Sequence, residues 1–237
     1  MTPDRPLNLI TLPEIFQVRE TASETAVSCG VATSQTDRDA RLAVVTATYL
    51  ERTYITPDDP HIINGLYHDP HEAQSIPLVA KYNGKVVASM RLILNRPLPL
   101  PINMDGVVVT GKYADIIKQE RLEISQLANL PITYDDPRIS PVLGLVASYF
   151  AIGRSLGIPT ALGVVDNKVL TLALNRKYHF GLPTIGPSID DYKGSPSTPT
   201  YIDITHVVES VRDHDPLTAA FLAGERNIPG FEWYVGP

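Results

Sequence analysis

Two apolar segments joined by Asn83-Gly84 constrain the fold of this chain more than any other feature of its sequence. The segments are 77–82 and 85–94, and aliphatic residues dominate both. Asn-Gly readily adopts the two positive φ angles of a type I′ turn, which connects antiparallel strands of normal twist. The sequence therefore predicts a β-hairpin over 77–94. Because side chains alternate along a strand, Arg91 lies on one face of the second strand.

Signals for helices and strands alternate along the rest of the chain. Capping residues, apolar periodicity and turn residues predict helices from Thr36 to Tyr54, from Ser140 to Gly157, from Asp166 to Gly181 and from Val207 to Phe221, and strands at 121–127, 161–165 and 201–205. This order predicts an α+β fold with a mixed sheet flanked by helices on both faces. We interpret 1–36 as an N-terminal arm, 37–205 as the core of one domain and 206–237 as its C-terminal helical extension.

The strand at 121–127 carries a carboxylate in an apolar setting. Glu123 and Ser125 share one face of this strand, and Gln126 is expected on the other. An unpaired buried carboxylate costs several kcal/mol, so Glu123 needs either a cationic partner or a chemical role as a base. Arg91 on the hairpin is the expected partner. A plain ion pair without catalysis is the alternative interpretation.

Composition excludes several classes of function. The net charge of −6 and the pI of about 5.5 give no reason to expect nucleic-acid binding. Cys29 is the single cysteine, so no intrachain disulfide forms and a reducing, cytoplasmic location is expected. No run of 18 apolar residues is present, so we expect no integral membrane segment. His68 and His71 lie in a Pro-rich loop without helical spacing, and we predict no metal site.

The order of elements and four short motifs resemble the GNAT acyltransferase superfamily, in particular its branch of acyl-homoserine-lactone synthases and N-acyl amino acid synthases. The resemblance covers 38–205. The motifs are Arg41 in the first helix, Asp69 in the next loop, Met90-Arg91-Leu92 in the hairpin and Glu123-Ile124-Ser125-Gln126 in the later strand. Lactone synthases carry Arg where this chain has Gln126, so the N-acyl amino acid synthases are more similar.

The resemblance implies a GNAT-like twisted sheet and an N-acyltransferase that moves a long-chain fatty acyl group from a thioester to the amine of an amino acid or similar small molecule. Glu123 is the candidate base, Ser125 would orient the amine, and backbone N–H groups near Leu127 would polarise the thioester carbonyl. The candidate site residues are Glu123, Ser125 and Arg91 for catalysis, and Arg41, Tyr54, Asp69, Gln126 and Leu127 for substrate binding. Core packing is the alternative for Tyr54, and a solvated helix position is the alternative for Arg41.

The acyl donor is either acyl carrier protein, through its acyl-phosphopantetheine, or acyl-CoA, and no permanently bound cofactor is expected. CoA-using relatives hold the pyrophosphate with a Gly-rich basic loop before a helix. The corresponding segment, 129–140, contains Asp135 and Asp136, a lone Arg138 and no glycine. This favours acyl carrier protein, whose acidic surface would dock on Arg154, Lys168, Arg176 and Lys177. Ordinary solvated helix charge is the alternative for these cations.

Two other functions remain open from the sequence. One is a CoA-dependent N-acetyltransferase, which would not need the deep apolar tunnel of a long-chain enzyme. The other is a catalytically silent GNAT-like domain that binds a ligand or partner.

Overall fold

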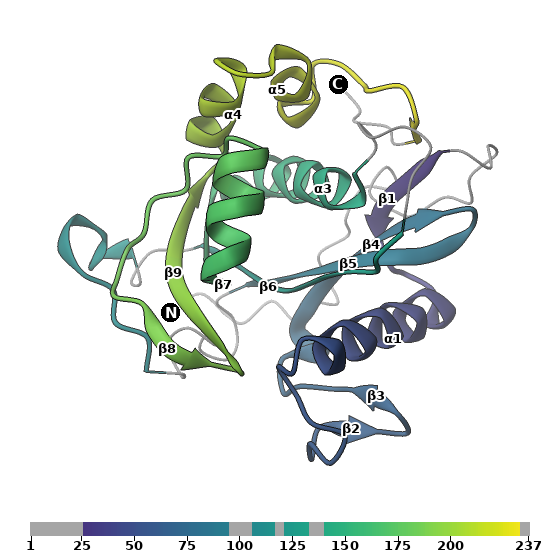
Figure 1. Ribbon diagram of the computed structural model, residues 1–237. Helices are drawn as coiled ribbons and strands as arrows, with labels where there is room; N and C mark the ends of the chain where they lie inside the picture. Colours follow the sequence, from purple (N-terminus) through teal and green to yellow (C-terminus); the bar gives the residue numbers. More distant parts are fainter. Residues whose placement is uncertain (1–25, 95–105, 117–120, 133–139, 233–237) are drawn as a thin grey trace, which may run out of the picture.

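The computed structural model describes residues 26–94, 106–116, 121–132 and 140–232. Within them, eight strands form a mixed sheet in the order β10-β1-β4-β5-β6-β7-β9-β8 (Figure 1). The strands are β1 (Val27–Val31), β4 (Ser75–Tyr82), β5 (Lys85–Leu94), β6 (Leu122–Asn129), β7 (Thr160–Asp166), β8 (Ile189–Tyr192), β9 (Ser195–Asp203) and β10 (Phe231–Glu232). A separate small hairpin consists of β2 (Ile62–Ile63) and β3 (Leu66–Tyr67).

Helices cover both faces of the sheet, as the sequence predicted. Helix α1 (Gln35–Glu51) lies on one face against β5 and β6, and α3 (Pro141–Leu156) lies on the other face against β1, β4 and β5 (Figure 1). The main core lies between the sheet and α3, and α4 (Ile204–Arg212) and α5 (Pro216–Ala223) extend this layer. The α+β fold class is therefore confirmed.

The two elements with the strongest local signals are confirmed. Strands β4 and β5 pair antiparallel, and the turn has φ of 52° at Asn83 and 71° at Gly84. Ser140 caps α3 with its side-chain oxygen, and Gly157 ends that helix in the left-handed conformation. In both cases the turn or cap is determined by residue types at the turn or at the helix end itself.

Other boundaries differ from the prediction. Residues of the expected arm form β1 inside the sheet, and Ser34 rather than Thr36 caps α1. The segment Val169–Lys177 is a π-helix, labelled η6, and not an α-helix. The expected helix from Val207 to Phe221 is two helices, because Asp215 caps a new one that begins at Pro216.

A bulge interrupts the pairing of β5 with β6. Arg91 lies opposite Ser125, whereas Ser89 lies opposite Ala128, so β6 carries one additional residue between these pairs. Gln126 adopts φ of 52° at this point. Such a bulge bends the strand and turns a side chain toward a different face.

Strands β6 and β7 separate soon after they meet. Their parallel pairing covers only Leu122 with Ala161 and Glu123 with Leu162. Beyond these pairs β7 continues alongside β9, and β6 continues alongside β5. The sheet is therefore open between β6 and β7. Within the described residues, no helix combines the length and apolar character needed to cross a bilayer.

Candidate active site

Arg91 and Asp69 form the centre of a buried polar network. Arg91 is 1% exposed, and its two terminal nitrogens donate to the two Asp69 oxygens at 2.5 Å each. Its Nε donates to Ser125 Oγ at 3.0 Å, and Nη1 also lies 3.4 Å from Glu72 Oε2. The bidentate contact combines charge with hydrogen bonds of fixed geometry. Arg91 thus joins β5 and β6 to the loop after β3.

Gln126 connects this network to α1. Its side-chain oxygen accepts a hydrogen bond from Arg41 Nη1 at 3.0 Å, and its amide nitrogen donates to Asp69 Oδ2 at 3.0 Å. Arg41 is fully buried and also forms an ion pair with Glu72. The alternative of a solvated Arg41 is therefore wrong. The expectation from strict alternation that Gln126 faces away from this site is also wrong, because the bulge turns it toward Asp69.

The ion pairs set the charge states of this network. Burial alone raises the pKa of Asp69, but the hydrogen bonds and charge of Arg91 outweigh it and hold the pKa below its ordinary value. Burial alone lowers the pKa of Arg91, but Asp69 and Glu72 outweigh it and raise that pKa. In Arg41 burial prevails over Glu72, and the pKa is lowered. The pairing of cations with carboxylates at close range keeps the network ionised.

The expected ion pair between Arg91 and Glu123 is wrong. The register places Glu123 opposite Ile93 and places Ser125 opposite Arg91, so the Arg91 guanidinium contacts Ser125 and not Glu123. Glu123 is 3% exposed, and its charge favours the ionised form of Arg121, whose pKa burial lowers. Glu123 therefore stands outside the Arg91 network while it lines the same cavity as Ser125.

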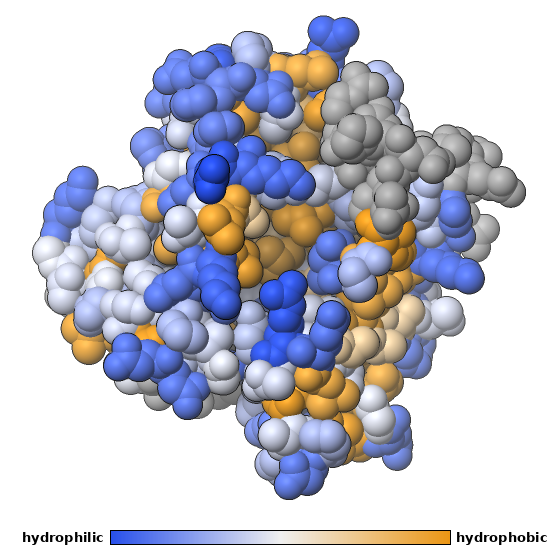
Figure 2. Space-filling view, in the orientation of Figure 1, coloured by the Kyte–Doolittle hydropathy of each residue, from blue (hydrophilic) through white to orange (hydrophobic). Residues whose placement is uncertain are grey.

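Two cavities meet at residues 124–126 of β6. A polar cavity of about 80 Å³ is lined by Tyr49, Tyr67, Asp69, Arg91, Glu123, Ile124, Ser125, Gln126, Val164, Tyr192 and Lys193. A mainly apolar cavity of about 170 Å³ lies where β6 and β7 separate. Its lining includes Met90, Leu127, Val146, Phe150, Leu174, Phe180 and Ile202 together with residues 124–126. Figure 2 shows an apolar hollow near the centre of this face, bordered by hydrophilic side chains.

Tyr54 belongs to the rim of the apolar cavity. Its hydroxyl donates to Asp166 Oδ2 at 3.2 Å, and its ring meets Tyr49 edge-on with centroids 5.5 Å apart. Burial, followed by the charge of Asp166, raises the pKa of Tyr54. Asp166 also accepts from the backbone N–H of Lys168 and Val169 at the start of η6. Tyr54 thus bridges the region after α1 to the end of β7.

The four cations expected to dock a carrier protein are not all brought together. Lys168, Arg176 and Lys177 are exposed along η6. Lys177 lies near the start of α3, in a cavity that Ser140 also lines. Arg154 lies near the other end of α3 and donates to the backbone oxygen of Leu222. Ser140 and Arg154 are 14 positions apart in sequence, which corresponds to about 21 Å along the helix axis. Arg154 is therefore separated from Lys177.

Glu72 and Lys193 were missed by the sequence interpretation. Glu72 begins a short 3₁₀ segment three residues after Asp69. Two acids at this spacing could have indicated that both contact the buried arginines. Lys193 is in the turn between β8 and β9, far along the chain from the other site residues. No signal in the sequence connected it with them.

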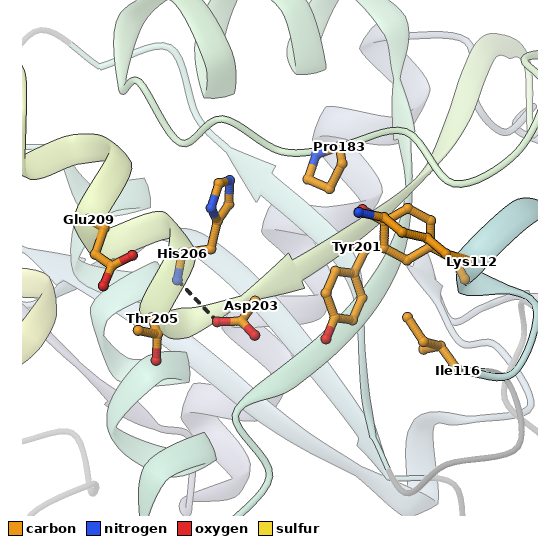
Figure 3. A pocket seen from close by; sticks show the side chains of 9 residues that line it. Lys112, Ile116, Pro183, Tyr201, Asp203, Thr205, His206 and Glu209 are labelled. Atoms are coloured by element: carbon orange, nitrogen blue, oxygen red, sulfur yellow. Dashed lines mark hydrogen bonds between the residues drawn. The ribbon is translucent and has the colours of Figure 1, made fainter.

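A wider groove of about 660 Å³ lies apart from these cavities and shares no lining residue with them. Lys112 and Ile116 lie on one side, and Asp203 and His206 lie on the other (Figure 3). Asp203 caps α4 by accepting from the backbone N–H of His206 at 3.0 Å, the contact drawn in Figure 3. This capping role accounts for Asp203 without chemistry. Among the described residues, no group of three or more His, Cys, Asp or Glu side chains is arranged for a metal ion.

No family model and no curated protein matches this chain. Solved structures do resemble it. FeeM, an N-acyl amino acid synthase from uncultured soil microbes, is similar at a TM-score of 0.56 and 14% identity, covering 80% of this chain and 98% of FeeM. The acyl-homoserine-lactone synthase LasI has a TM-score of 0.52 and 15% identity, covering 75% of this chain and 88% of LasI. BjaI, a CoA-dependent acyl-homoserine lactone synthase solved with SAM and isopentyl-CoA, has a TM-score of 0.52 and 14% identity, covering 79% and 88%.

These likenesses agree with the resemblance that the motifs at Arg41, Asp69, Arg91 and Glu123 indicate. At this level of identity they establish the arrangement of helices and strands. The chain has the GNAT-like fold that the N-acyl amino acid synthases and the acyl-homoserine-lactone synthases share.

Proposed function

We propose that this protein is an N-acyltransferase that moves a fatty acyl group from a thioester donor to the amine of a small molecule such as an amino acid. One observation carries the proposal. The polar cavity that holds Glu123 and Ser125 adjoins the apolar cavity at the open edge of β6. An amine and an acyl chain bound in these two cavities would meet at residues 124–126.

The proposed reaction uses Glu123 as the base. The amine nitrogen attacks the thioester carbonyl carbon, a C–N bond forms, the C–S bond breaks, and Glu123 accepts the proton that the amine loses. Ser125 is held by Arg91 Nε and would orient the amine. Backbone N–H groups of β6 past Glu123 no longer belong to the ladder with β7, which makes them the candidate donors to the carbonyl oxygen. The leaving thiolate takes up a proton.

The apolar cavity supports an acyl group larger than acetyl. The cavity volume of about 170 Å³ is several times the ~30 Å³ that one water molecule occupies in the liquid. Since a methylene group is of similar size, on the order of six methylenes fit. A chain of medium length therefore fits directly, and a long chain requires the cavity to widen. This favours fatty acyl transfer over N-acetyl transfer.

We propose acyl carrier protein as the donor, with acyl-CoA as the second candidate. Lys168, Arg176 and Lys177 are exposed on η6, whose residues Val169 and Leu174 line the apolar cavity. An acidic carrier docked there would deliver its thioester next to the opening. The argument from Asp135 and Asp136 concerns 133–139, outside the described residues. BjaI, which has a similar fold, is a CoA-dependent synthase, so acyl-CoA stays the second candidate donor.

The test supplies the purified protein with acyl carrier protein and CoA donors from acetyl to hexadecanoyl, together with a panel of amino acids. Thiol release and mass spectrometry of the products report turnover. Charge reversal at Lys168, Arg176 and Lys177 together should lower turnover of the carrier-bound donor about tenfold or more and leave a short acyl-pantetheine donor unaffected. Lys85→Glu, at the exposed first residue of β5, is the matched control.

Added salt should also slow the carrier reaction, because exposed charges are screened over about 10 Å at 0.1 M. Efficient use of acyl-CoA with no effect of the charge reversals would reject the carrier protein as donor. Absence of any N-acyl product with every donor would reject the proposed function.

A further inference from the structure

The apolar cavity lies in the opening between β6 and β7, and its lining comes from both sides of that opening. Leu127 of β6 and Phe150 of α3 line it on one side. Val169 and Leu174 of η6 and Ile202 of β9 line it on the other side. Because β6 and β7 pair only where they first meet, the sheet itself does not hold these two sides together along the cavity. The width of the cavity therefore depends on contacts made elsewhere between the two sides.

Such a contact is present at the end of α1. This helix packs against β5 and β6 and ends at Glu51. Shortly after it, the Tyr54 hydroxyl donates to Asp166 Oδ2, at the end of β7, at 3.2 Å. The turn between β8 and β9 packs beside this contact (Figure 1), since a Cβ atom built on Gly194 would lie 2.5 Å from Thr53 O and 3.1 Å from Tyr54 Cα. The region after α1 thus joins the two sides of the opening.

Asp166 connects this contact to the wall of the cavity. Its other oxygen, Oδ1, accepts from the backbone N–H groups of Lys168 at 2.8 Å and Val169 at 3.1 Å, at the start of η6. Burial alone raises the pKa of Asp166, but its backbone and side-chain hydrogen bonds outweigh burial and lower that pKa. Hydrogen bonds to an ionised acceptor are stronger than those between neutral groups. One carboxylate therefore links Tyr54 to the start of η6, where Val169 lines the cavity.

We propose that the hydrogen bond between Tyr54 and Asp166 limits the length of the acyl group that the protein accepts. The cavity of about 170 Å³ holds on the order of six methylenes. A longer chain would have to move β7 and η6 away from β6 and break this hydrogen bond, whereas a chain that fits leaves it intact. Because the hydrogen bond opposes only the wider state of the cavity, it disfavours long chains selectively. The inference rests on the proposed acyl transfer.

The test removes the hydrogen bond and keeps the packing. Tyr54→Phe lacks the hydroxyl but retains the ring that meets Tyr49 edge-on. The wild-type protein should use hexadecanoyl donors less efficiently than octanoyl donors. In Tyr54→Phe, the ratio of kcat/KM for hexadecanoyl to that for octanoyl donors should rise about tenfold, the factor expected for the loss of a hydrogen bond to a charged group. Tyr113→Phe, which removes a hydroxyl from the separate wide groove, is the matched control and should leave this ratio unchanged.

Binding of free fatty acids gives a readout that does not require the correct donor. Octanoate and hexadecanoate are each allowed to displace the fluorescent fatty acid cis-parinarate from the protein. In Tyr54→Phe, the ratio of their dissociation constants should shift about tenfold in favour of hexadecanoate. This shift would support the inference even if none of the acyl donors is turned over.

Equal use of octanoyl and hexadecanoyl donors by the wild-type protein would overturn the inference and leave acyl transfer standing, because no limit on chain length would then exist. A ratio that stays unchanged in Tyr54→Phe would overturn it as well, including the case of an equal loss at both chain lengths. If no N-acyl product forms with any donor, the proposed acyl transfer fails, and the displacement experiment decides the inference separately. Absence of fatty-acid binding at both lengths would then overturn it.

Discussion

Replacement of Asp69 by Asn should destabilise the protein because it leaves the Arg91 charge largely uncompensated. Arg91 is 1% exposed; of its two hydrogen bonds of 2.5 Å to Asp69, one loses its acceptor in Asn and the other loses the negative charge of the carboxylate. Breaking a buried pair from one side costs about 3–5 kcal/mol. Glu72 Oε2, 3.4 Å from Arg91 Nη1, retains part of the attraction. We therefore expect a loss of about 3 kcal/mol in the free energy of unfolding.

Urea denaturation at neutral pH measures this loss, with Asp190→Asn at an exposed position of β8 as the control that should change little. The double variant Asp69→Asn with Arg91→Met should be less destabilised than the two single variants added together, because it removes both charges. A loss in Asp69→Asn below about 1 kcal/mol, or fully additive effects, would refute the assignment of this pair as a main stabilising contact.

The pH dependence of stability gives an independent check of the Asp69–Arg91 pair. The pKa of Asp69 is depressed in the folded protein, so the folded state releases its proton more readily than the unfolded state. The contribution of Asp69 is present above the unfolded pKa of about 3.9 and is lost as the pH falls through the folded pKa. Asp69→Asn should therefore lose less stability on acidification than the wild-type protein. If the free energy of unfolding fell equally with pH in both proteins, the lowered pKa of Asp69 would be contradicted.

Three further predictions test catalysis, chain length and packing. Glu123→Gln should fold normally but lower acyl transfer on the order of 10²–10⁴-fold, as the loss of a general base does, and near-normal turnover would assign Glu123 a structural role. Leu174→Trp should fill the apolar cavity and lower kcat/KM for octanoyl donors about tenfold more than for acetyl donors, whereas an unchanged ratio would place the chain elsewhere. Gly144→Ala should destabilise the protein by about 1–3 kcal/mol, seen as a lower melting temperature, because a Cβ there would collide with Cys29 Sγ and Phe231.

Elements encoded by adjacent residues were predicted well from the sequence. The β4–β5 hairpin follows from Asn83-Gly84, and α3 follows from Ser140-Pro141 and Gly157. Strands β1 and β10 were not predicted because each is short, and they pair with each other across almost the whole chain. Their strand conformation comes from tertiary contact and not from local propensity.

The sequence predicted several side chains that the fold brings together, but not the contacts between them. Arg41, Asp69, Arg91 and Gln126 do come together, yet the predicted partner of Arg91 was Glu123. Side chains alternate between the two faces of a strand only where there is no bulge. No residue type in the sequence marks the bulge in β6. The π-helix η6 was missed for a similar reason, because apolar spacing in a short segment does not distinguish a π-helix from an α-helix.

The bulge in β6 makes the site sensitive to a change of a single residue in chain length. The register is regular on both sides of it, with Arg91 opposite Ser125 and Ser89 opposite Ala128. Deletion of Leu127 would join these two registers into one continuous ladder and remove the left-handed conformation of Gln126. The shortened strand would pair more regularly, but Gln126 would turn away from Asp69 and Arg41. A more regular sheet at this position would therefore remove the contacts that Gln126 makes with Arg41 and Asp69.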